Sequence, residues 1–163
     1  MATAAVDRRA LTHEDAATAP RTRVQIVAGA VGAVFLLVGI LGFVPGVVSN
    51  FDDLSFASHH SGAELLGLFQ VSVLHNIVHL GFGVAGLLLA RKGERAATLF
   101  LLVGGLVYIV LAVYGAAIEH DTSALNFVPV NEADSYLHLG LGSLMIAAGV
   151  VVTKGRDLRD LAQ

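Results

Sequence analysis

Four long intervals of the chain contain only uncharged residues. They run from 24 to 51, from 65 to 90, from 96 to 118 and from 135 to 153. A helix needs about 20 predominantly apolar residues to cross the hydrocarbon core of a bilayer, so each interval is long enough for one span. The pattern therefore predicts four transmembrane helices. We expect Pro45 to end the first helix, because proline cannot continue a helix interior, and the second helix to extend a turn or two beyond the hydrocarbon.

The composition agrees with this pattern. Of the 163 residues, 55% are hydrophobic and 14% are charged, and the mean hydropathy is +0.74. Soluble domains carry about 25% charged residues, so this chain has the composition of an integral membrane protein. The expected fold is an all-α, integral membrane four-helix bundle in one domain. Cysteine is absent, which excludes disulfides, thiolate metal sites and cysteine nucleophiles.

The basic residues predict the orientation of this bundle. In a four-span arrangement all ten Lys and Arg residues fall on one side of the membrane. They are Arg8, Arg9, Arg21, Arg23, Arg91, Lys92, Arg95, Lys154, Arg156 and Arg159. The connections on the opposite side contain Asp and Glu but no Lys or Arg. Because loops rich in Lys and Arg remain in the cytoplasm, both termini are expected to be cytoplasmic.

The charged ends define the expected domain limits. Residues 1–22 are rich in Ala and Thr with mixed charges, which predicts a disordered cytoplasmic tail. Residues 23–153 form the expected domain of four transmembrane helices, and 154–163 form a short cytoplasmic tail. Glycines recur throughout the spans, and small residues let membrane helices approach closely. We therefore expect Gly140 and Gly142 to face neighbouring helices.

Two short sequence motifs, which we call words, occur twice in the chain. Phe-Val-Pro occurs at 43–45 and 127–129, and His-Leu-Gly-x-Gly occurs at 79–83 and 138–142. This order suggests a parallel repeat of two helices about an axis normal to the membrane. The distance between the two words differs in the two halves, and such short words also match by chance in a chain rich in Gly and Leu. The repeat therefore stays open at this stage.

Ionisable rings interrupt the apolar pattern of the second and fourth spans. Ser72, His75, Asn76 and His79 share one face of a helix. His75 and His138 lie equally far from the basic residues that follow their spans, roughly 24 Å at about 1.5 Å per residue. Tyr108 reaches a similar depth from the third span. Since lipid cannot satisfy such polar groups, we expect these side chains to converge inside the bundle.

The candidate site consists of a few polar side chains and admits several interpretations. Its residues are His75, His79, His138, Tyr108 and Asn76. The cluster is either a polar network that holds helices together or a ligand set. As a ligand set, His75, His79 and His138 would bind zinc or copper, or one histidine of the second span and His138 would bind haem b. A proton-linked or quinone-facing role is a further alternative.

Two longer segments carry a family resemblance. They are 65-LLGLFQVSVLHNIVHLGFGVAGLLLAR-91 and 125-LNFVPVNEADSYLHLGLG-142. They resemble a bacterial, mainly actinobacterial, family of membrane proteins known as the domain of unknown function numbered four-three-eight-three. The resemblance implies four transmembrane helices in the plasma membrane and implies no activity. The polar pattern of the family maps onto Gln70, His75, Asn76, His79, Asn126, Pro129, Asn131, Asp134 and His138.

Two hypotheses about function follow. The chain has no Gly-rich phosphate loop and no nucleophile elbow of the hydrolase type, so the sequence indicates no enzyme class. It also has no basic aromatic patch for nucleic acid. The first hypothesis is an accessory or structural membrane module that contacts the lipid bilayer and another membrane protein or a second copy of itself. The alternative is a redox-type module that binds haem b or a metal ion through His75, His79 and His138. The sequence alone leaves the cofactor undetermined.

Overall fold

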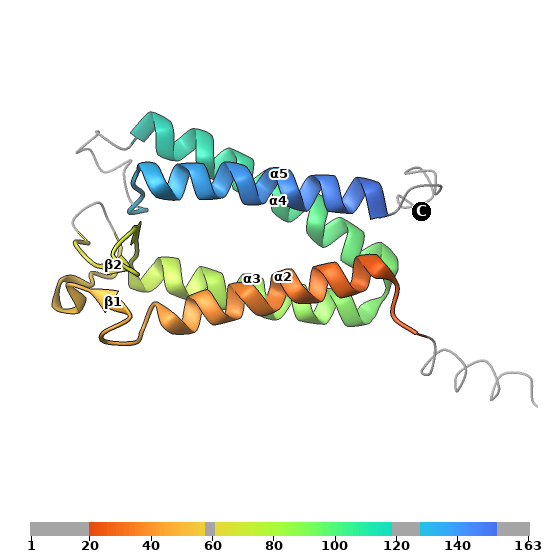
Figure 1. Cartoon of the computed structure of the whole chain (residues 1–163), viewed down its shortest axis with the longest axis horizontal. Coiled ribbons are helices and arrows are strands. Elements are labelled where there is room, and N and C mark those ends of the chain that lie inside the picture. Colours follow the sequence, from red (N-terminus) through yellow and green to blue (C-terminus); the bar gives the residue numbers. More distant parts are fainter. Residues whose placement is uncertain (1–19, 58–60, 119–127, 153–163) are drawn as a thin grey trace, which may run out of the picture.

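The computed structural model describes residues 20–57, 61–118 and 128–152. These residues form four long helices, each long and apolar enough to cross a membrane (Figure 1). They are α2 (Arg23–Leu41), α3 (Val73–Lys92), α4 (Glu94–Ile118) and α5 (Glu132–Val152). The expectation of an all-α, multi-pass membrane protein is confirmed. The division into tails and a central domain stays a prediction, because 1–19 and 153–163 lie outside the described residues.

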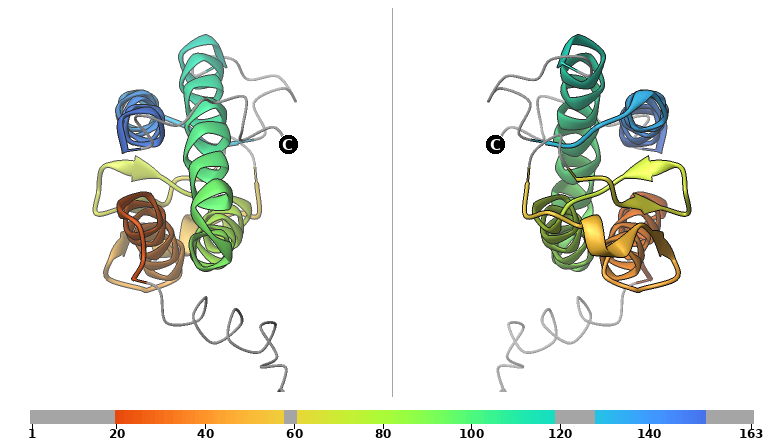
Figure 2. Two further views of the ribbon diagram at one scale, coloured as in Figure 1. Left: turned by 90° about the vertical axis from the view of Figure 1, so that its right-hand side faces the viewer. Right: turned by 90° about the vertical axis from the view of Figure 1, so that its left-hand side faces the viewer.

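The helices pack as two antiparallel pairs. α2 lies chiefly against α3, and α4 lies chiefly against α5. Only Gly93 separates α3 from α4, so these two helices meet at one end of the bundle and diverge towards the other, as Figure 1 shows. Figure 2 shows α4 crossing the other helices obliquely. The two helix pairs are therefore joined along a limited seam.

Three short strands cover one end of the bundle, which we call the strand end. β1 (Val48–Ser49), β2 (Glu64–Leu65) and β3 (Phe69–Gln70) form an antiparallel sheet in that order. The expectation that α3 extends by a turn or two is wrong here, because β2 and β3 occupy that part of the second apolar interval. Leu66 and Gly67 both have positive φ, 57° and 67°, so the chain reverses into a hairpin before α3 begins.

The first helix ends before Pro45, contrary to expectation. α2 ends at Leu41, and the N–H of Gly42 donates to the carbonyl of Val38 at 3.0 Å. The amide of Asn76, from α3, donates to the carbonyl of Gly42 at 2.6 Å. A Cβ atom at Gly42 would lie only 2.1 Å from Asn76 Oδ1. The helix therefore ends where the Asn76 side chain from α3 occupies the space beside its backbone.

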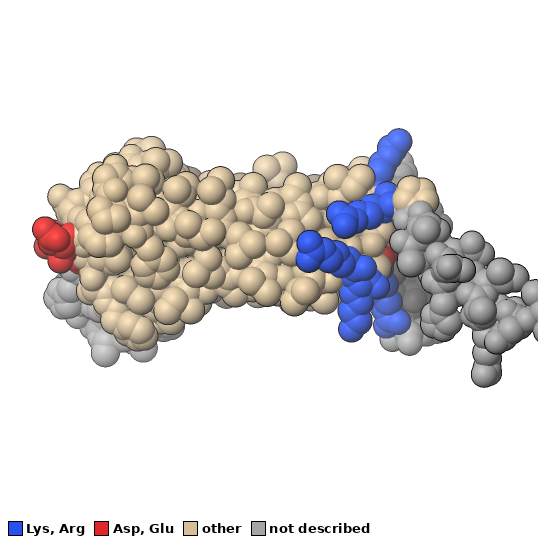
Figure 3. All heavy atoms as spheres, turned by 90° about the horizontal axis from the view of Figure 1, so that it is seen from below, with Lys and Arg blue, Asp and Glu red and all other residues tan. Residues whose placement is uncertain are grey.

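Charge is divided between the two ends of the described chain. Figure 3 shows the described Lys and Arg side chains gathered at the end opposite the strands, which we call the basic end. Asp52 and Asp53 lie in a short 3-10 helix (Phe51–Asp53) at the strand end. This distribution agrees with the charge pattern of the sequence. The cytoplasmic location of the basic end follows from the positive-inside rule and stays a prediction.

The two glycines of each His-Leu-Gly-x-Gly word face in different directions. A Cβ atom at Gly81 or Gly140 would meet nothing within 4 Å. A Cβ atom at Gly142 would lie 2.7 Å from the carbonyl oxygen of Gly105 on α4. The expectation for Gly142 is therefore confirmed, and that for Gly140 is wrong. On an α-helix, residues two apart point to different sides, so both glycines cannot face the same neighbour.

The first helix pair repeats this packing. A Cβ atom at Gly83 would lie 2.8 Å from the carbonyl oxygen of Gly32 on α2. Gly32 precedes Phe35 by three residues, as Gly105 precedes Tyr108. The second glycine of each word thus packs on a Gly-x-x-aromatic segment of the preceding helix. The two helix pairs therefore correspond in this packing, as the His-Leu-Gly-x-Gly words suggested.

The Phe-Val-Pro words are not part of that repeat. Pro45 follows the end of α2, whereas Pro129 lies just before the start of α5. The helix starts do correspond, because Ser72 Oγ accepts from the N–H of His75 at 3.1 Å and Asn131 Oδ1 accepts from the N–H of Asp134 at 3.0 Å. The extra length of the first half lies between its two helices and contains the strands.

Candidate functional site

Four rings meet where the two helix pairs touch. Phe35, His79, Tyr108 and His138 come from α2, α3, α4 and α5, and we call them the ring layer. The ring centroids of Phe35 and Tyr108 are 5.2 Å apart, those of Phe35 and His79 are 5.6 Å apart, and those of Tyr108 and His138 are 5.0 Å apart. Each helix thus contributes one ring to a contact that spans both pairs.

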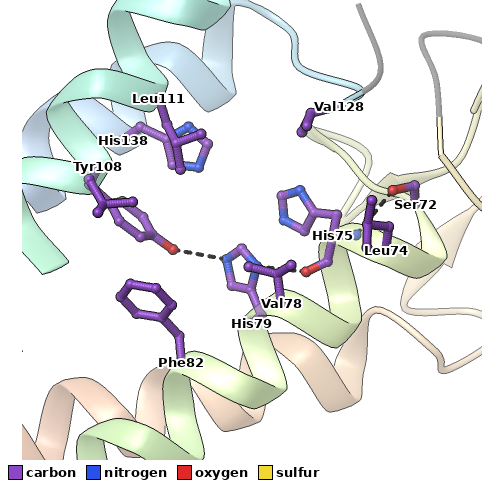
Figure 4. Close-up of a pocket in the computed structure, with 11 residues that line it drawn as sticks. Ser72, Leu74, His75, Val78, His79, Phe82, Tyr108, Leu111, Val128 and His138 are labelled. Carbon is purple, nitrogen blue, oxygen red and sulfur yellow. Dashed lines mark hydrogen bonds between the residues drawn. The ribbon is translucent and has the colours of Figure 1, made fainter.

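His79 forms hydrogen bonds through both ring nitrogens. Its Nδ1 lies 3.0 Å from the carbonyl oxygen of His75, and because a carbonyl only accepts, Nδ1 carries the proton. Its Nε2 then accepts from the Tyr108 hydroxyl at 3.3 Å, as Figure 4 shows. This side chain therefore connects the first turn of α3 with α4.

His75 stacks on His79 and leaves its ring nitrogens available. The two ring planes are 9° from parallel, with centroids 4.3 Å apart. Among the described residues, no hydrogen-bond partner of the His75 ring is found, in contrast to the ring of His79. The Ser72 cap fixes the start of the helix beneath it, because Ser72 Oγ accepts from the His75 backbone N–H. Within the part of the chain that the structure describes, backbone and stacking contacts position His75.

His138 has the least exposed surface of the three histidines. Its side chain is 4% exposed, and its ring meets the Tyr108 ring edge-on at 85°. Within the described part of the chain, its Nδ1 atom is buried without a hydrogen-bond partner. A buried polar atom in that state costs about 1–3 kcal/mol relative to a satisfied one.

Asn76 lies apart from the other predicted site residues. It is buried, and its amide holds the end of α2 at Gly42. The corresponding residue of the second pair is Ser135, which lies against Gly115 of α4. The structure therefore brings His75, His79, Tyr108 and His138 together and assigns Asn76 to helix packing.

Within the described residues, a cavity flanks the ring layer on each side. The α3–α4 cavity has a volume of about 280 Å³, and its walls include His75, Val78, Phe82, Val107 and Leu111 (Figure 4). The α2–α5 cavity has a volume of about 240 Å³. Its walls include Asp134, Leu137 and Leu141 of α5 and Val34 and Val38 of α2. In the helix repeat these residues correspond, in the same order, to the five wall residues just named for the α3–α4 cavity.

The two cavities differ in the polar group at the strand end. His75 lines both cavities, and the α2–α5 cavity also has Asp134, which is 2% exposed and is the residue that the repeat pairs with His75. A carboxylate oxygen of Asp134 accepts from the backbone N–H of Gln70 at 3.0 Å and of Asn131 at 3.1 Å. Asn131 caps α5, and Asp134 lies in the first turn of this helix. The carboxylate joins the hairpin to α5.

The predicted metal site does not fit this geometry. Among the described residues, no group of three or more His, Asp or Glu side chains is placed to hold a metal ion. Both nitrogens of His79 are engaged, and its ring lies parallel to that of His75 instead of converging with it on one point.

The predicted haem site does not fit with His79 as a ligand either. Tyr108 contacts His79 through its hydroxyl and His138 through its ring, so its side chain occupies the space between these two histidines. An axial pair of His79 and His138 would require that side chain to leave. His79, Tyr108 and His138 therefore form a helix contact, and the pairing of His75 with His138 on a haem stays a prediction.

Several participants escaped the sequence-based selection. Phe35 belongs to the ring layer, and Phe82 packs on Phe35 and Tyr108 at 5.6 and 6.0 Å. A signal for Phe35 was present, since Gly32-x-x-Phe35 matches Gly105-x-x-Tyr108. Asp134 was named only in the polar pattern of the family and not among the candidate site residues, although it lines the α2–α5 cavity.

The profile of one protein family matches most of the chain. It covers residues 25–151, and its description is Domain of unknown function (DUF4383). The match includes all four helices except the first two residues of α2 and the last residue of α5. No curated protein and no solved structure gives a match.

Proposed function

The chain belongs to the family described as Domain of unknown function (DUF4383), and on that premise we propose that it is an accessory or structural four-helix module of the plasma membrane. Its ring layer joins the two helix pairs. Its lipid-facing surfaces contact the bilayer and another membrane protein or a second copy of the chain. The positive-inside rule gives both termini to the cytoplasm.

The observation that carries this proposal is the double engagement of His79. One nitrogen bonds to the backbone of α3 and the other to Tyr108 of α4. In lipid, the hydrophobic effect does not drive helices together, so hydrogen bonds and close packing decide which helices associate. A histidine with both nitrogens used in this way stabilises the fold and is not free to bind a metal.

The stability test compares two tyrosine-to-phenylalanine variants. Tyr108→Phe removes the hydrogen bond to His79 and is expected to lower the free energy of unfolding by about 0.6 kcal/mol, with an upper range of about 1.7 kcal/mol for membrane proteins. Tyr136→Phe is the matched control, because the hydroxyl of Tyr136 bonds to Glu132 on the exposed surface. It is expected to leave unfolding in mixed detergent micelles unchanged.

The same purified protein separates this function from the redox alternative. We expect neither a Soret absorption band nor a stoichiometric metal by elemental analysis. If haem b or a metal ion is present and is lost on His79→Leu or His138→Leu, the protein is the redox-type module and this proposal is wrong.

The accessory role is tested by the mass of the complex that contains the chain in native membranes. Cross-linking before extraction is expected to shift the chain from its mass of 16.9 kDa to a discrete larger species. Mass spectrometry then identifies the second component as another membrane protein or the chain itself. A chain that remains monomeric at its native level contradicts the accessory role.

A further inference from the structure

The α3–α4 cavity opens on the surface that faces lipid. Val78 of α3 and Val107 of α4 line it and are 50% and 39% exposed. Both helices are membrane spans by length and hydropathy, so exposed valines between their ends face hydrocarbon. The mouth of the cavity is therefore reached from within the bilayer.

The inner wall of this cavity has unused hydrogen-bonding capacity. The rings of His75 and His138 both line it, as Figure 4 shows. Among the described residues, the His75 ring has no hydrogen-bond partner, and His138 Nδ1 has none either. A neutral imidazole has one donor and one acceptor nitrogen. Polar groups without partners in an apolar site favour any molecule that satisfies them.

The cavity on the other side of the ring layer is also lined by His75 and His138, but its walls include a carboxylate as well. This carboxylate belongs to Asp134 and accepts two backbone hydrogen bonds. Leu65, Leu66 and Phe69 of the hairpin also line that cavity. The halves of the repeat have thus diverged: both cavities are lined by His75 and His138, but only the α3–α4 cavity has no carboxylate among the described residues of its walls.

The walls specify the chemistry of the occupant. None of the described residues that line the cavity is Asp, Glu, Lys or Arg, so a charged group would be buried without a counter-charge. Apart from Ser72, the remaining walls are aliphatic or aromatic, including Phe82 and Tyr108. Small-molecule pockets commonly measure about 300–1,000 Å³, so a cavity at the lower limit admits a ring-sized head and leaves a tail outside.

We propose that the α3–α4 cavity binds the head of a lipid-soluble quinone or quinol, with His75 and His138 as its hydrogen-bonding residues and the tail passing between Val78 and Val107. An imidazole N–H donates to a quinone carbonyl, and an unprotonated imidazole nitrogen accepts from a quinol hydroxyl. The flat head lies among aromatic rings, which favour offset or edge contacts. This site goes beyond the proposed structural role and does not depend on it.

The test is equilibrium binding of a benzoquinone with a decyl tail to the full chain in phosphatidylcholine nanodiscs. Empty nanodiscs measure partition into lipid. The expected result is saturable binding above that background, at one quinone per chain. Decane, which resembles the tail without the ring head, is expected not to displace the bound quinone from the wild type or from the variants, because the site recognises the head.

Two phenylalanine variants on α3 form a matched pair. Val78→Phe fills the mouth, whereas Val84→Phe places the same ring at a valine of nearly equal exposure, 48%, that does not line the cavity. We expect Val78→Phe to weaken binding by about tenfold or more, a change of one decade in Kd, and Val84→Phe to leave it unchanged. His75→Leu is expected to weaken it as Val78→Phe does.

Three results would overturn the proposal. They are no saturable binding above empty nanodiscs, equal binding by Val78→Phe and Val84→Phe, or unchanged binding by His75→Leu. If Val78→Phe does not fold, the His75→Leu result decides alone. The stability of Tyr108→Phe is measured without quinone, so failure here leaves the proposed structural role standing.

Discussion

Phe35 and Tyr108 occupy corresponding positions of the two helix pairs and contact each other across the seam, with ring centroids 5.2 Å apart. Each also meets a histidine of its own pair, Phe35 with His79 and Tyr108 with His138. The difference between the two rings is one hydroxyl. That hydroxyl gives His79 a partner on the other pair, and its absence from Phe35 leaves His138 without the equivalent bond.

Restoring the hydroxyl is therefore a test of the repeat. Phe35→Tyr is expected to place a hydroxyl beside His138, as Tyr108 places one beside His79. A net hydrogen bond contributes about 0.5–1.5 kcal/mol, so the free energy of unfolding should rise by that amount. Reversible unfolding in mixed micelles measures it.

Phe100→Tyr is the control for this variant. Phe100 is buried and packs on Phe82, so the added hydroxyl enters an apolar cluster and is expected to destabilise the protein. Equal loss of stability in both variants would show that the two helix pairs are not equivalent at this position.

The glycines of the two His-Leu-Gly-x-Gly words give a prediction with controls built into each word. Gly83→Leu and Gly142→Leu are expected to destabilise the bundle, because overpacking a close contact costs about 1–3 kcal/mol. Gly81→Leu and Gly140→Leu should preserve or slightly raise thermal stability, since these positions are open and Leu is the better helix former. The same melting temperature for all four variants would refute the packing described here.

The orientation in the membrane can be tested with single cysteines, because the chain has none of its own. Asp52 and Lys92 are both exposed and lie at opposite ends of the bundle. In intact cells, Asp52→Cys should react with a membrane-impermeant maleimide and Lys92→Cys should react only after lysis. The reverse pattern would place the termini outside the cytoplasm.

Charge and hydropathy were sufficient to predict the four helices, because membrane spans depend on length and apolar composition alone. The hairpin before α3 was missed, since Leu65 to Val71 are as uncharged as a span and the turn depends on the backbone at Leu66 and Gly67. The end of α2 was misplaced for a similar reason: it depends on the Asn76 side chain from another helix.

The three histidines and Tyr108 of the candidate site were predictable, but Phe35 and the hydrogen bonds of the site were not. Periodicity placed His75 and His79 on one face, and depth placed Tyr108 and His138 beside them. Whether such rings converge on a ligand or on each other depends on ring orientation, which spacing does not specify. The parallel stack of His75 on His79 and the hydroxyl of Tyr108 between the helix pairs decide it.

The central claim is that His79 connects the two helix pairs through both of its ring nitrogens. The most direct measurement is the ¹⁵N spectrum of the histidine side chains in uniformly histidine-labelled protein, with His79 assigned by its loss in His79→Gln. We predict a neutral His79 ring protonated at Nδ1, whose Nε2 resonance shifts in Tyr108→Phe and does not shift in Tyr136→Phe. A His79 ring protonated at Nε2, or one unaffected by Tyr108→Phe, would contradict the account.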